Sequence, residues 1–360
     1  SQLFLYHTNG NIKHISLRFF LATILMPMVI PSGNARLQMF IPFMEEINRK
    51  HELSSKSSFI RFTIWTLGGI NQLSTLIVFT GGGLAVLAFQ LLIDLGYQLT
   101  WISWFLLMAP PIWFTCILLG FVMFKYYLKS ADSWSKKALH IEETAMKESL
   151  LKPQKQEYQF WFVCIVFALL ILFWIIGPWI HLSTIVPILL ALLIFAIPGI
   201  SLLNNKDLRN YDWENFFLLG SALSLAVSIQ QNGTAKWMSD VIFSFFGQSE
   251  SELMNLIIVM IVILFIRCLF VNPTGALTVT YPLVMTFASS LSLNSLFLFL
   301  ITVILAGSYM ILPMSSPIMI IAHGTGYIKL KEHIFFSSLA LLIIFLITIV
   351  SYFFYWPIII

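Results

Sequence analysis

Long apolar runs separated by short polar gaps occupy most of this chain. The hydrocarbon core of a bilayer is about 30 Å thick, so a helix needs about 20 apolar residues to cross it. Runs near that length lie at 15–31, 59–79, 101–127, 158–178, 182–203, 214–230, 253–271, 293–312 and 334–357. Weaker apolar segments lie at 35–44, 84–97, 235–246, 275–290 and 317–328. The pattern predicts an all-α polytopic membrane protein with roughly eight to eleven crossings.

Composition agrees with this fold class and excludes several others. Of the 360 residues, 59% are hydrophobic and 10% are charged, whereas a soluble domain has about 25% charged residues. The net charge of +4 is small and its bases lie in loops beside apolar runs, so nucleic acid is not an expected partner. Cys116, Cys164 and Cys268 lie inside apolar runs without CxxC spacing, which indicates neither a disulfide framework nor a zinc site.

Lysine and arginine gather in alternate loops, which predicts a topology. If 128–157 is a cytoplasmic linker, the basic loops at 47–58, 204–212 and 328–333 lie inside as well. The opposite loops, at 98–100, 179–182, 247–252 and 290–294, contain no Lys or Arg. This multi-pass arrangement in the cytoplasmic membrane works only if 15–46 and 253–290 are re-entrant hairpins. Trp101, Trp104, Trp179 and Trp356 then fall at the outer interface, as in an aromatic belt.

The two hairpins resemble each other. When Pro42 is aligned with Pro282, the stretch Ser32-Gly33-Asn34-Ala35 falls on Asn272-Pro273-Thr274-Gly275. Each hairpin is followed by an interrupted helix, and the hairpins open to opposite sides, so we expect inverted repeats. The predicted parts are a first repeat at 1–127 (hairpin 15–46, broken helix 59–97, helix 101–127), the linker 128–157, and a second repeat at 158–360 (hairpin 253–290, broken helix 293–328, final helix 334–357).

Clusters of Gly, Pro and Ser at 31–34, 80–83, 272–275 and 313–317 interrupt the apolar runs. At bilayer depth such interruptions free backbone groups, which must be buried in protein or line a cavity. Helix N-termini there attract anions, and freed carbonyls can coordinate a small cation. We therefore expect an anion and cation site at these clusters. Its polar side chains would be Ser32, Asn34, Asn272, Thr274, Ser315 and Ser316.

Ionisable residues inside the runs are few. Arg36 follows the first hairpin tip, where its planar fork suits a carboxylate, although an internal ion pair or snorkelling is an equal alternative. For Arg267, a buried pair or structural hydrogen bonds are favoured. Arg18 and Arg61 lie near the inner face, where we expect them to snorkel. We expect His323 to be a packing histidine ahead of a proton or substrate role.

Several stretches carry a family resemblance. Ser308-Tyr309-Met310-Ile311-Leu312-Pro313-Met314-Ser315-Ser316-Pro317, followed by His323-Gly324-Thr325-Gly326-Tyr327, resembles a signature of a Ser-Phe-x-x-x-Leu-Pro run, a Thr-Pro-Pro-Asn break and a Gly-Ser-Gly-Tyr end. The stretches Asp212-Trp213 to Leu219-Gly220, Gly233 to Trp237, and Asp94 to Trp104 are similar to further segments of the same family. It is the divalent anion:sodium symporter family, the sodium-coupled dicarboxylate, citrate and sulfate carriers of the ion transporter superfamily. The chain resembles it from about residue 10, beginning after the family's first helices.

The resemblance implies a homodimeric elevator-type transporter with sodium at the hairpin tips and the substrate between them. On this basis the candidate cation-binding residues are Ser32, Gly33, Asn34, Gly82, Asn272, Thr274 and Met314. An Arg after the first tip, as at Arg36, is a feature of members resembling citrate and dicarboxylate exchangers.

The chain departs from the family pattern at both tips. Ser32-Gly33-Asn34 and Asn272-Pro273-Thr274 stand where the family has Ser-Asn-Thr, and the Asn of each break is replaced, by Met319 and by Leu84 or Ala85. Sodium coupling and the substrate therefore stay open.

The sequence predicts a secondary active transporter of a divalent organic anion, a di- or tricarboxylate, by sodium-coupled symport or carboxylate exchange. No cofactor is expected besides Na⁺ as a candidate coupling ion, and the expected partners are the bilayer, a small anion and a second protomer. The alternatives are a sodium/proton antiporter or an inorganic oxyanion (sulfate, arsenite) transporter of the same superfamily. An intramembrane enzyme is disfavoured because no acid/base or metal constellation is evident. The first repeat begins almost at its hairpin, so we expect an N-terminal truncation or a gene remnant.

Overall fold

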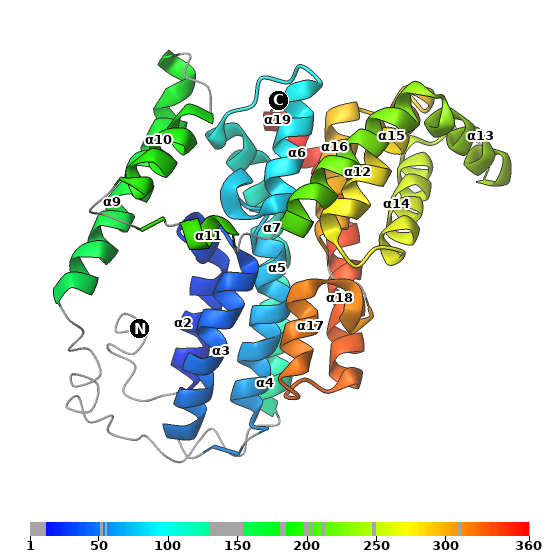
Figure 1. Cartoon of the computed structure of the whole chain (residues 1–360). Coiled ribbons are helices and arrows are strands. Elements are labelled where there is room, and N and C mark those ends of the chain that lie inside the picture. The colour runs from blue at the N-terminus through cyan, green and yellow to red at the C-terminus, as the bar shows by residue number, and fades with distance from the viewer. Residues whose placement is uncertain are drawn as a thin grey trace.

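The computed structural model describes residues 12–50, 53–54, 56–129, 154–180, 185–197, 202–203, 205–209, 213–246, 250–308 and 311–359. Every secondary-structure element within these residues is helical (Figure 1). The expected linker at 128–157 falls outside the described residues except at its two ends. The same holds for parts of the expected loops at 179–182, 204–212 and 247–252.

The first part of the chain is a helix pair, an interrupted helix and a long helix. The elements are α2 (Ile12–Leu25), a 3₁₀ turn (Met26–Met28), α3 (Gly33–Lys50), α4 (Ser58–Trp65), a π turn (Thr66–Ile70), α5 (Asn71–Ser74), a 3₁₀ turn (Phe79–Gly81), α6 (Gly83–Asp94) and α7 (Trp101–Lys129). Helices α2 and α3 pack against each other, with the rings of Phe19 and Phe40 5.8 Å apart. The Gly68-Gly69 pair lies in the π turn, so the helix is interrupted only later, between Thr75 and Gly82.

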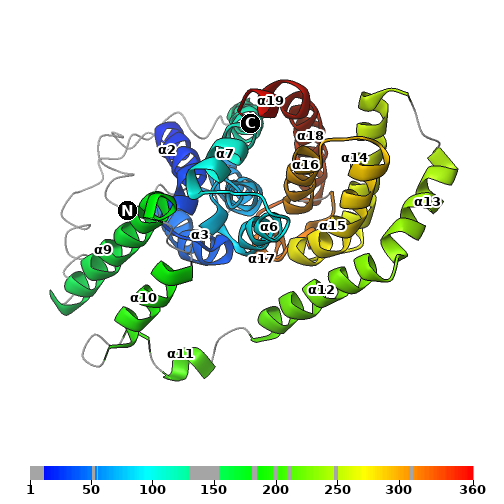
Figure 2. The same cartoon turned by 90° about the horizontal axis from the view of Figure 1, so that it is seen from above.

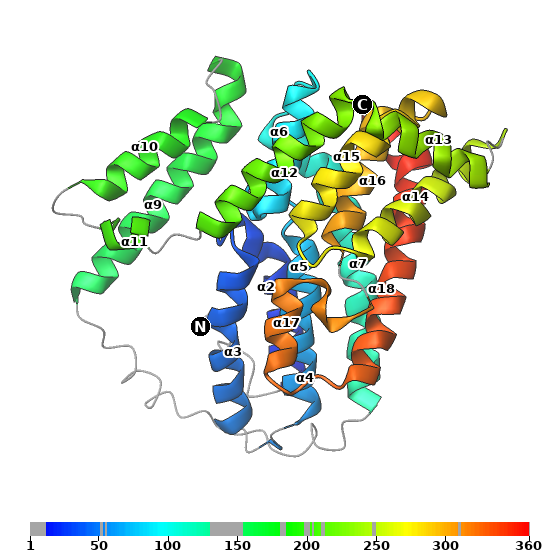
Figure 3. The ribbon, with the colours of Figure 1, turned by 45° about the vertical axis from the view of Figure 1, so that its right-hand side comes forward.

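The same order of elements recurs at the C-terminal end. The elements are α14 (Glu252–Cys268), α15 (Pro273–Ser290), α16 (Ser295–Gly307), a 3₁₀ turn (Pro313–Ser315), α17 (Pro317–Gly324), α18 (Leu330–Val350), a π turn (Ser351–Tyr355) and α19 (Trp356–Ile359). Figures 1 and 3 show α2 and α3 in the lower half of the molecule and α14 and α15 in the upper half. The two helix pairs therefore occupy opposite ends of the bundle.

The middle of the chain forms an outer arc around this bundle, as the view from above shows (Figure 2). It comprises α9 (Gln154–Ile176), α10 (Ile185–Ala196), α11 (Asn205–Arg209), α12 (Trp213–Gln231) and α13 (Thr234–Phe246). Large apolar side chains on these helices are exposed, among them Trp161, Leu193 and Phe217. Such a surface suits lipid or another apolar partner better than water.

Two described helices are long and apolar enough to cross a membrane by themselves, Trp101–Tyr127 and Leu330–Ile359. Shorter apolar helices lie at Gly83–Asp94, Trp161–Ile176, Ile185–Ala196 and Ser295–Gly307. Within the described residues, interruptions divide the apolar segments at 59–97 and 293–328 into short helices, so neither segment forms one continuous span.

The two interrupted helices cross at glycines. A Cβ added at Gly307, the last residue of α16, would lie 2.7 Å from Cδ1 of Leu76 and 3.0 Å from Cδ2 of Leu84. A Cβ added at Gly68 would lie 3.0 Å from Cβ of Ala322 in α17. Small residues allow this close approach of backbones in membrane helices. The crossing places both interruptions in the centre of the bundle.

The expected aromatic belt is wrong for two of its members. Trp104 and Trp356 are fully buried, and their indole N–H groups donate to the carbonyls of Leu76 at 3.0 Å and of Leu107 at 2.9 Å. The Leu76 carbonyl lies in the first interruption, where no helical partner is available. Trp104 therefore satisfies a backbone acceptor instead of anchoring the chain at a lipid interface.

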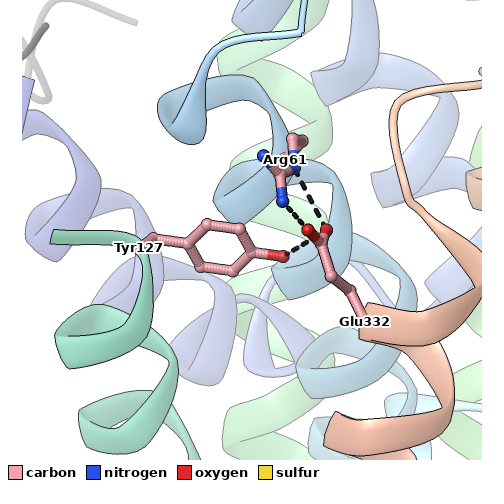
Figure 4. Close-up of polar contacts among 3 residues, drawn as sticks. All are labelled: Arg61, Tyr127 and Glu332. Atoms are coloured by element: carbon pink, nitrogen blue, oxygen red, sulfur yellow. Dashed lines mark hydrogen bonds and ion pairs between the residues drawn. The ribbon is translucent and has the colours of Figure 1, made fainter. Parts of the chain in front are cut away.

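A buried ion pair joins α4, in the first part of the chain, to α18, in the last part (Figure 4). Nε of Arg61, in α4, donates to Oε2 of Glu332 at 3.0 Å, and its Nη2 is ion-paired with Oε1 of the same carboxylate. The Tyr127 hydroxyl, from the end of α7, donates to Oε2 of Glu332 at 3.3 Å. The side chains of Arg61 and Glu332 are 12% and 5% exposed. Arg61 is therefore paired inside the protein, and the expectation that it snorkels is wrong.

We expect Glu332→Leu to destabilise the full-length protein by about 3–5 kcal/mol, because it leaves the Arg61 guanidinium buried without its counter-ion. The double variant Arg61→Met/Glu332→Leu should recover most of this loss, since apolar side chains of similar volume often replace a buried pair without cost. Thermal unfolding in detergent measures both effects. As a control, Arg49→Met removes an exposed pair with Glu46 and should change stability by less than about 1 kcal/mol. A double variant no more stable than Glu332→Leu would contradict this account.

Candidate functional site

The tip of the first helix pair is capped locally by Ser32. Its Oγ accepts a hydrogen bond from the backbone N–H of Ala35 at 3.2 Å, so that α3 begins at Gly33. A serine in this position satisfies one of the free N–H groups of the first helical turn. Ser32 and Asn34 are both exposed. Their side chains are therefore accessible at the tip.

The first tip is held between both interrupted helices. Nδ2 of Asn71, in α5, donates to the Gly33 carbonyl at 2.9 Å. A Cβ added at Gly33 would lie 2.5 Å from Cδ1 of Ile318 and 3.3 Å from Cγ2 of Thr75. The tip thus contacts the first interruption through Thr75 and the helix after the second interruption through Ile318.

Glycines shape the first interruption. A Cβ added at Gly81 would lie 2.3 Å from the carbonyl oxygen of Thr75 and 3.3 Å from Cβ of Pro27. Gly82 is half-buried beside Thr75 and precedes α6, whereas Gly83 has open space around its Cα. The absence of a side chain at Gly81 is therefore what lets the chain fold back on itself beside the first tip.

The second tip and the second interruption have their own caps. Oδ1 of Asn272 accepts from the N–H of Thr274 at 3.0 Å, and Oγ of Ser316 accepts from the N–H of Met319 at 3.1 Å. Ser316 is fully buried and Ser315 nearly so, while Met314 is 61% exposed. The hydroxyl of Ser316 is thus committed to the start of α17.

Arg36 is buried at the first tip, and its charge is not neutralised there. It is 1% exposed, and Nε donates to the Ser32 carbonyl at 3.3 Å. Nη1 and Nη2 have no hydrogen-bond partner among the described residues. Burial of an ionised group without a partner is costly, typically several kcal/mol. The two outer nitrogens of the guanidinium thus lack both a hydrogen-bond acceptor and a counter-ion among the described residues.

Arg267 is equally buried but fully engaged. Nε donates to the Ala306 carbonyl at 2.7 Å and Nη1 to the Phe270 carbonyl at 2.5 Å. Nη2 donates to the carbonyls of Ser308 at 3.3 Å and Ser315 at 2.7 Å. The guanidinium thus ties the second tip to the second interruption through backbone oxygens. This agrees with the structural hydrogen bonds favoured for Arg267.

The residues predicted from the sequence fall into two groups. Ser32, Gly33, Asn34, Arg36 and Gly82 lie around the first tip and the first interruption. Asn272 and Thr274 lie at the second tip, and Met314, Ser315 and Ser316 in the second interruption, which Arg267 bridges. The first tip reaches the second group through Ile318, two residues beyond Ser316.

Asn71 is a site residue that the sequence prediction missed. It is fully buried, its Nδ2 holds the first tip, and its Oδ1 has no hydrogen-bond partner in the described structure. The sequence does contain a signal for it, because an amide side chain in the middle of the apolar run at 59–79 needs a hydrogen-bond partner inside the protein.

His323 lies elsewhere in the second part of the chain. Its ring is 4.8 Å from that of His333 in α18, in an edge-to-face arrangement. The Ser337 hydroxyl lies 3.3 Å from Nε2 of His333. His323 thus packs at the α17–α18 contact, but its Nε2 is buried without a hydrogen-bond partner among the described residues, so the expected packing histidine is not satisfied there.

Comparison with known proteins gives a family. The protein-family model for the sodium:sulfate symporter transmembrane region matches residues 7–360 of the sequence. A sodium-dependent dicarboxylate transporter, SdcS, of Staphylococcus saprophyticus is 26% identical over 348 residues, which cover 88% of this chain and 64% of that protein. SdcS of Staphylococcus aureus (strain USA300) is 26% identical over 346 residues, with the same coverage of 88% and 64%. The chain therefore spans about two thirds, 64%, of the length of these relatives.

We expect Gly81→Ala to lower thermal stability and transport of the full-length protein strongly, because its Cβ would lie 2.3 Å from a backbone oxygen that cannot rotate away. A strained fit of this kind typically costs 1–3 kcal/mol. Gly83→Ala, two residues later, meets nothing within 4 Å and is the matched control. Equal melting temperatures for the two variants would show that the first interruption is not packed as described.

Proposed function

The chain belongs to the sodium:sulfate symporter family, and from this premise we propose that the whole protein is a secondary active transporter of a divalent organic anion. The substrate is a di- or tricarboxylate, moved by sodium-coupled symport or by carboxylate exchange. The family membership supports transport, and the names of the SdcS relatives support sodium and a dicarboxylate. Because the chain spans 64% of those relatives, substrate and coupling are proposed for the full-length protein.

The observation that carries this proposal is the partner set of Arg36. Its Nη1 and Nη2 are buried at the first tip without a hydrogen-bond partner among the described residues. Two parallel N–H groups of one guanidinium match the two oxygens of a carboxylate, and such charge-assisted pairs are about twice as strong as neutral hydrogen bonds. A bound carboxylate would supply the missing acceptors and relieve the cost of burying the charge.

The transport architecture is part of the same proposal. The two helix pairs are re-entrant hairpins of inverted repeats, located in the cytoplasmic membrane and opening to opposite sides. The support is the recurring order of helix pair, interrupted helix and long helix, with the pairs at opposite ends of the bundle (Figure 3). Alternating access by an elevator movement and a homodimeric assembly rest on the family resemblance. The exposed apolar side chains of α9, α10 and α12 provide a surface for lipid or for a second protomer.

For sodium, the first tip offers a suitable acceptor. Oδ1 of Asn71 is a buried oxygen without a donor, next to the tip carbonyl that Nδ2 of the same side chain holds. An amide oxygen together with backbone oxygens is a ligand type that Na⁺ accepts in transporters built from discontinuous helices. We propose that the coupling ion of a symport mechanism binds at Asn71 and the first tip together with the substrate anion, whose negative charge offsets both the ion and Arg36.

Uptake of labelled succinate, citrate and sulfate into proteoliposomes, with and without an inward Na⁺ gradient, tests the function. We expect Arg36→Ala to reduce carboxylate uptake at least about 30-fold, since truncating one partner of a buried charge pair costs 2 kcal/mol or more. Arg36→Lys should recover only part of the activity, because an ammonium keeps the charge and loses the fork.

Arg49→Ala is the matched control, because Arg49 belongs to the same helix and its side chain is 79% exposed. It should leave uptake unchanged. Full carboxylate uptake by Arg36→Ala would exclude the role of Arg36. Uptake of sulfate alone by the unmodified protein would favour the inorganic oxyanion transporter to which the family description refers.

A further inference from the structure

Backbone carbonyls from three segments converge at the second hairpin tip. They belong to Phe270 in the tip, to Ala306 in the last turn of α16, and to Ser308 and Ser315 in the second interruption. Carbonyls freed by unwound helix ends are the oxygens with which discontinuous membrane helices coordinate a sodium ion. In this chain they converge on a side chain instead. The four carbonyls all accept hydrogen bonds from the guanidinium of Arg267.

We infer that the Arg267 guanidinium is a built-in cation that takes the place of a sodium ion at the second hairpin tip. Arg267 is fully buried, and its three nitrogens each donate to at least one of these oxygens, at 2.5–3.3 Å. The group thus supplies both the positive charge and the ligand contacts that an ion would supply. This inference rests on the proposed transport function, because a sodium ion is expected at the tips only in a sodium-coupled carrier.

A sodium ion does not fit beside this guanidinium. The ion would compete for lone pairs that already accept N–H groups, and two positive charges a few ångströms apart repel strongly in a buried site. The described side chains of the second tip and the second interruption carry no negative charge: Asn272 and Ser316 are engaged in caps, and Met314 carries a neutral thioether. The family's sodium at the second tip is therefore replaced by a residue in this chain.

The two buried arginines have opposite partner sets, and the contrast supports the assignment. Arg267 donates to four carbonyls, whereas Nη1 and Nη2 of Arg36 have no partner within the described residues. Nη1 and Nη2 of Arg36 are thus able to bind an anion. The N–H groups of Arg267 are already bonded to backbone carbonyls and do not bind substrate. The positive charge at the second tip belongs to a side chain, so it is not released or taken up when the sodium concentration changes. A symport mechanism would then use only the cation position at the first tip, near Asn71.

The sequence departs from the family in the same place. The second tip reads Asn272-Pro273-Thr274 where the family has Ser-Asn-Thr, and Met319 stands in place of the Asn of the second break. Both changes remove an oxygen-bearing side chain from the neighbourhood of a second ion. Because Arg267 supplies the positive charge, side-chain oxygens at these two positions would have no ion to coordinate.

The test is equilibrium binding of ²²Na⁺ to the purified full-length protein, at constant ionic strength with choline as the replacement cation and without any organic anion. We expect the unmodified protein to bind no more than one Na⁺ per protomer. Arg267→Ala leaves the four carbonyls without donors in an open space and should bind one Na⁺ more than the unmodified protein. Its melting temperature should rise with Na⁺ more than that of the unmodified protein.

Two further variants serve as controls. Arg267→Met fills the space with an apolar chain and should gain no Na⁺, and Arg267→Lys keeps the charge and should gain none either. Two Na⁺ per protomer in the unmodified protein, or no additional Na⁺ in a folded Arg267→Ala, would overturn the inference. If Arg267→Ala does not fold, the stoichiometry of the unmodified protein decides alone. Because no anion is present, failure of carboxylate transport would count against the proposed function and not against this result.

Discussion

Backbone groups that lose their helical partners at the centre of this bundle must find others within the protein. An apolar environment offers no water to compensate, and each unsatisfied group there costs several kcal/mol. The structure meets this requirement with side chains from distant segments. Trp104 in α7 donates to the Leu76 carbonyl, and Arg267 donates to the carbonyls around the second interruption. Asn71 adds a hydrogen bond to the Gly33 carbonyl at the first tip. These hydrogen bonds fix the positions of both hairpin tips and both interruptions.

The same constraint distinguishes the polar groups that the fold uses from those that it leaves unpaired. A side chain that satisfies a free backbone donor or acceptor is used by the fold: Ser316 accepts from the N–H of Met319, and Trp104 donates to the carbonyl of Leu76. The buried groups that remain without a partner in the described structure include Nη1 and Nη2 of Arg36 and Oδ1 of Asn71. Arg36 and Asn71 both lie at the first tip, where the proposed transport function needs donors for an anion and an oxygen for its coupling cation.

Much of the element order could be predicted from the sequence. Clusters of Gly, Pro and Ser divide long apolar runs, and the structure turns or interrupts its helices at 26–32, 75–82, 269–272, 308 and 311–316. The boundaries were less predictable. The second interruption begins at Ser308, before the Pro313–Pro317 cluster, because α16 ends at Gly307, where it meets Leu76 and Leu84. The proposed elevator movement and sodium sites rest on the family resemblance and not on local sequence patterns.

Long-range partners explain the failures. Arg61 and Glu332 are 271 residues apart. Nothing near Arg61 in the sequence indicates that its partner is a carboxylate at the start of α18. Trp104 and Trp356 lie near helix ends, as belt residues would, yet each turns inward to a carbonyl. The position of Arg36 in the sequence predicts its burial. Only the folded structure shows that Arg267 has four carbonyl partners and that Nη1 and Nη2 of Arg36 have none among the described residues. The most direct test is a structure of the full-length protein with bound succinate or citrate. We predict a carboxylate on Nη1 and Nη2 of Arg36, with Arg267 still on its carbonyls; an Arg36 paired with a protein carboxylate, and substrate bound elsewhere, would contradict the account.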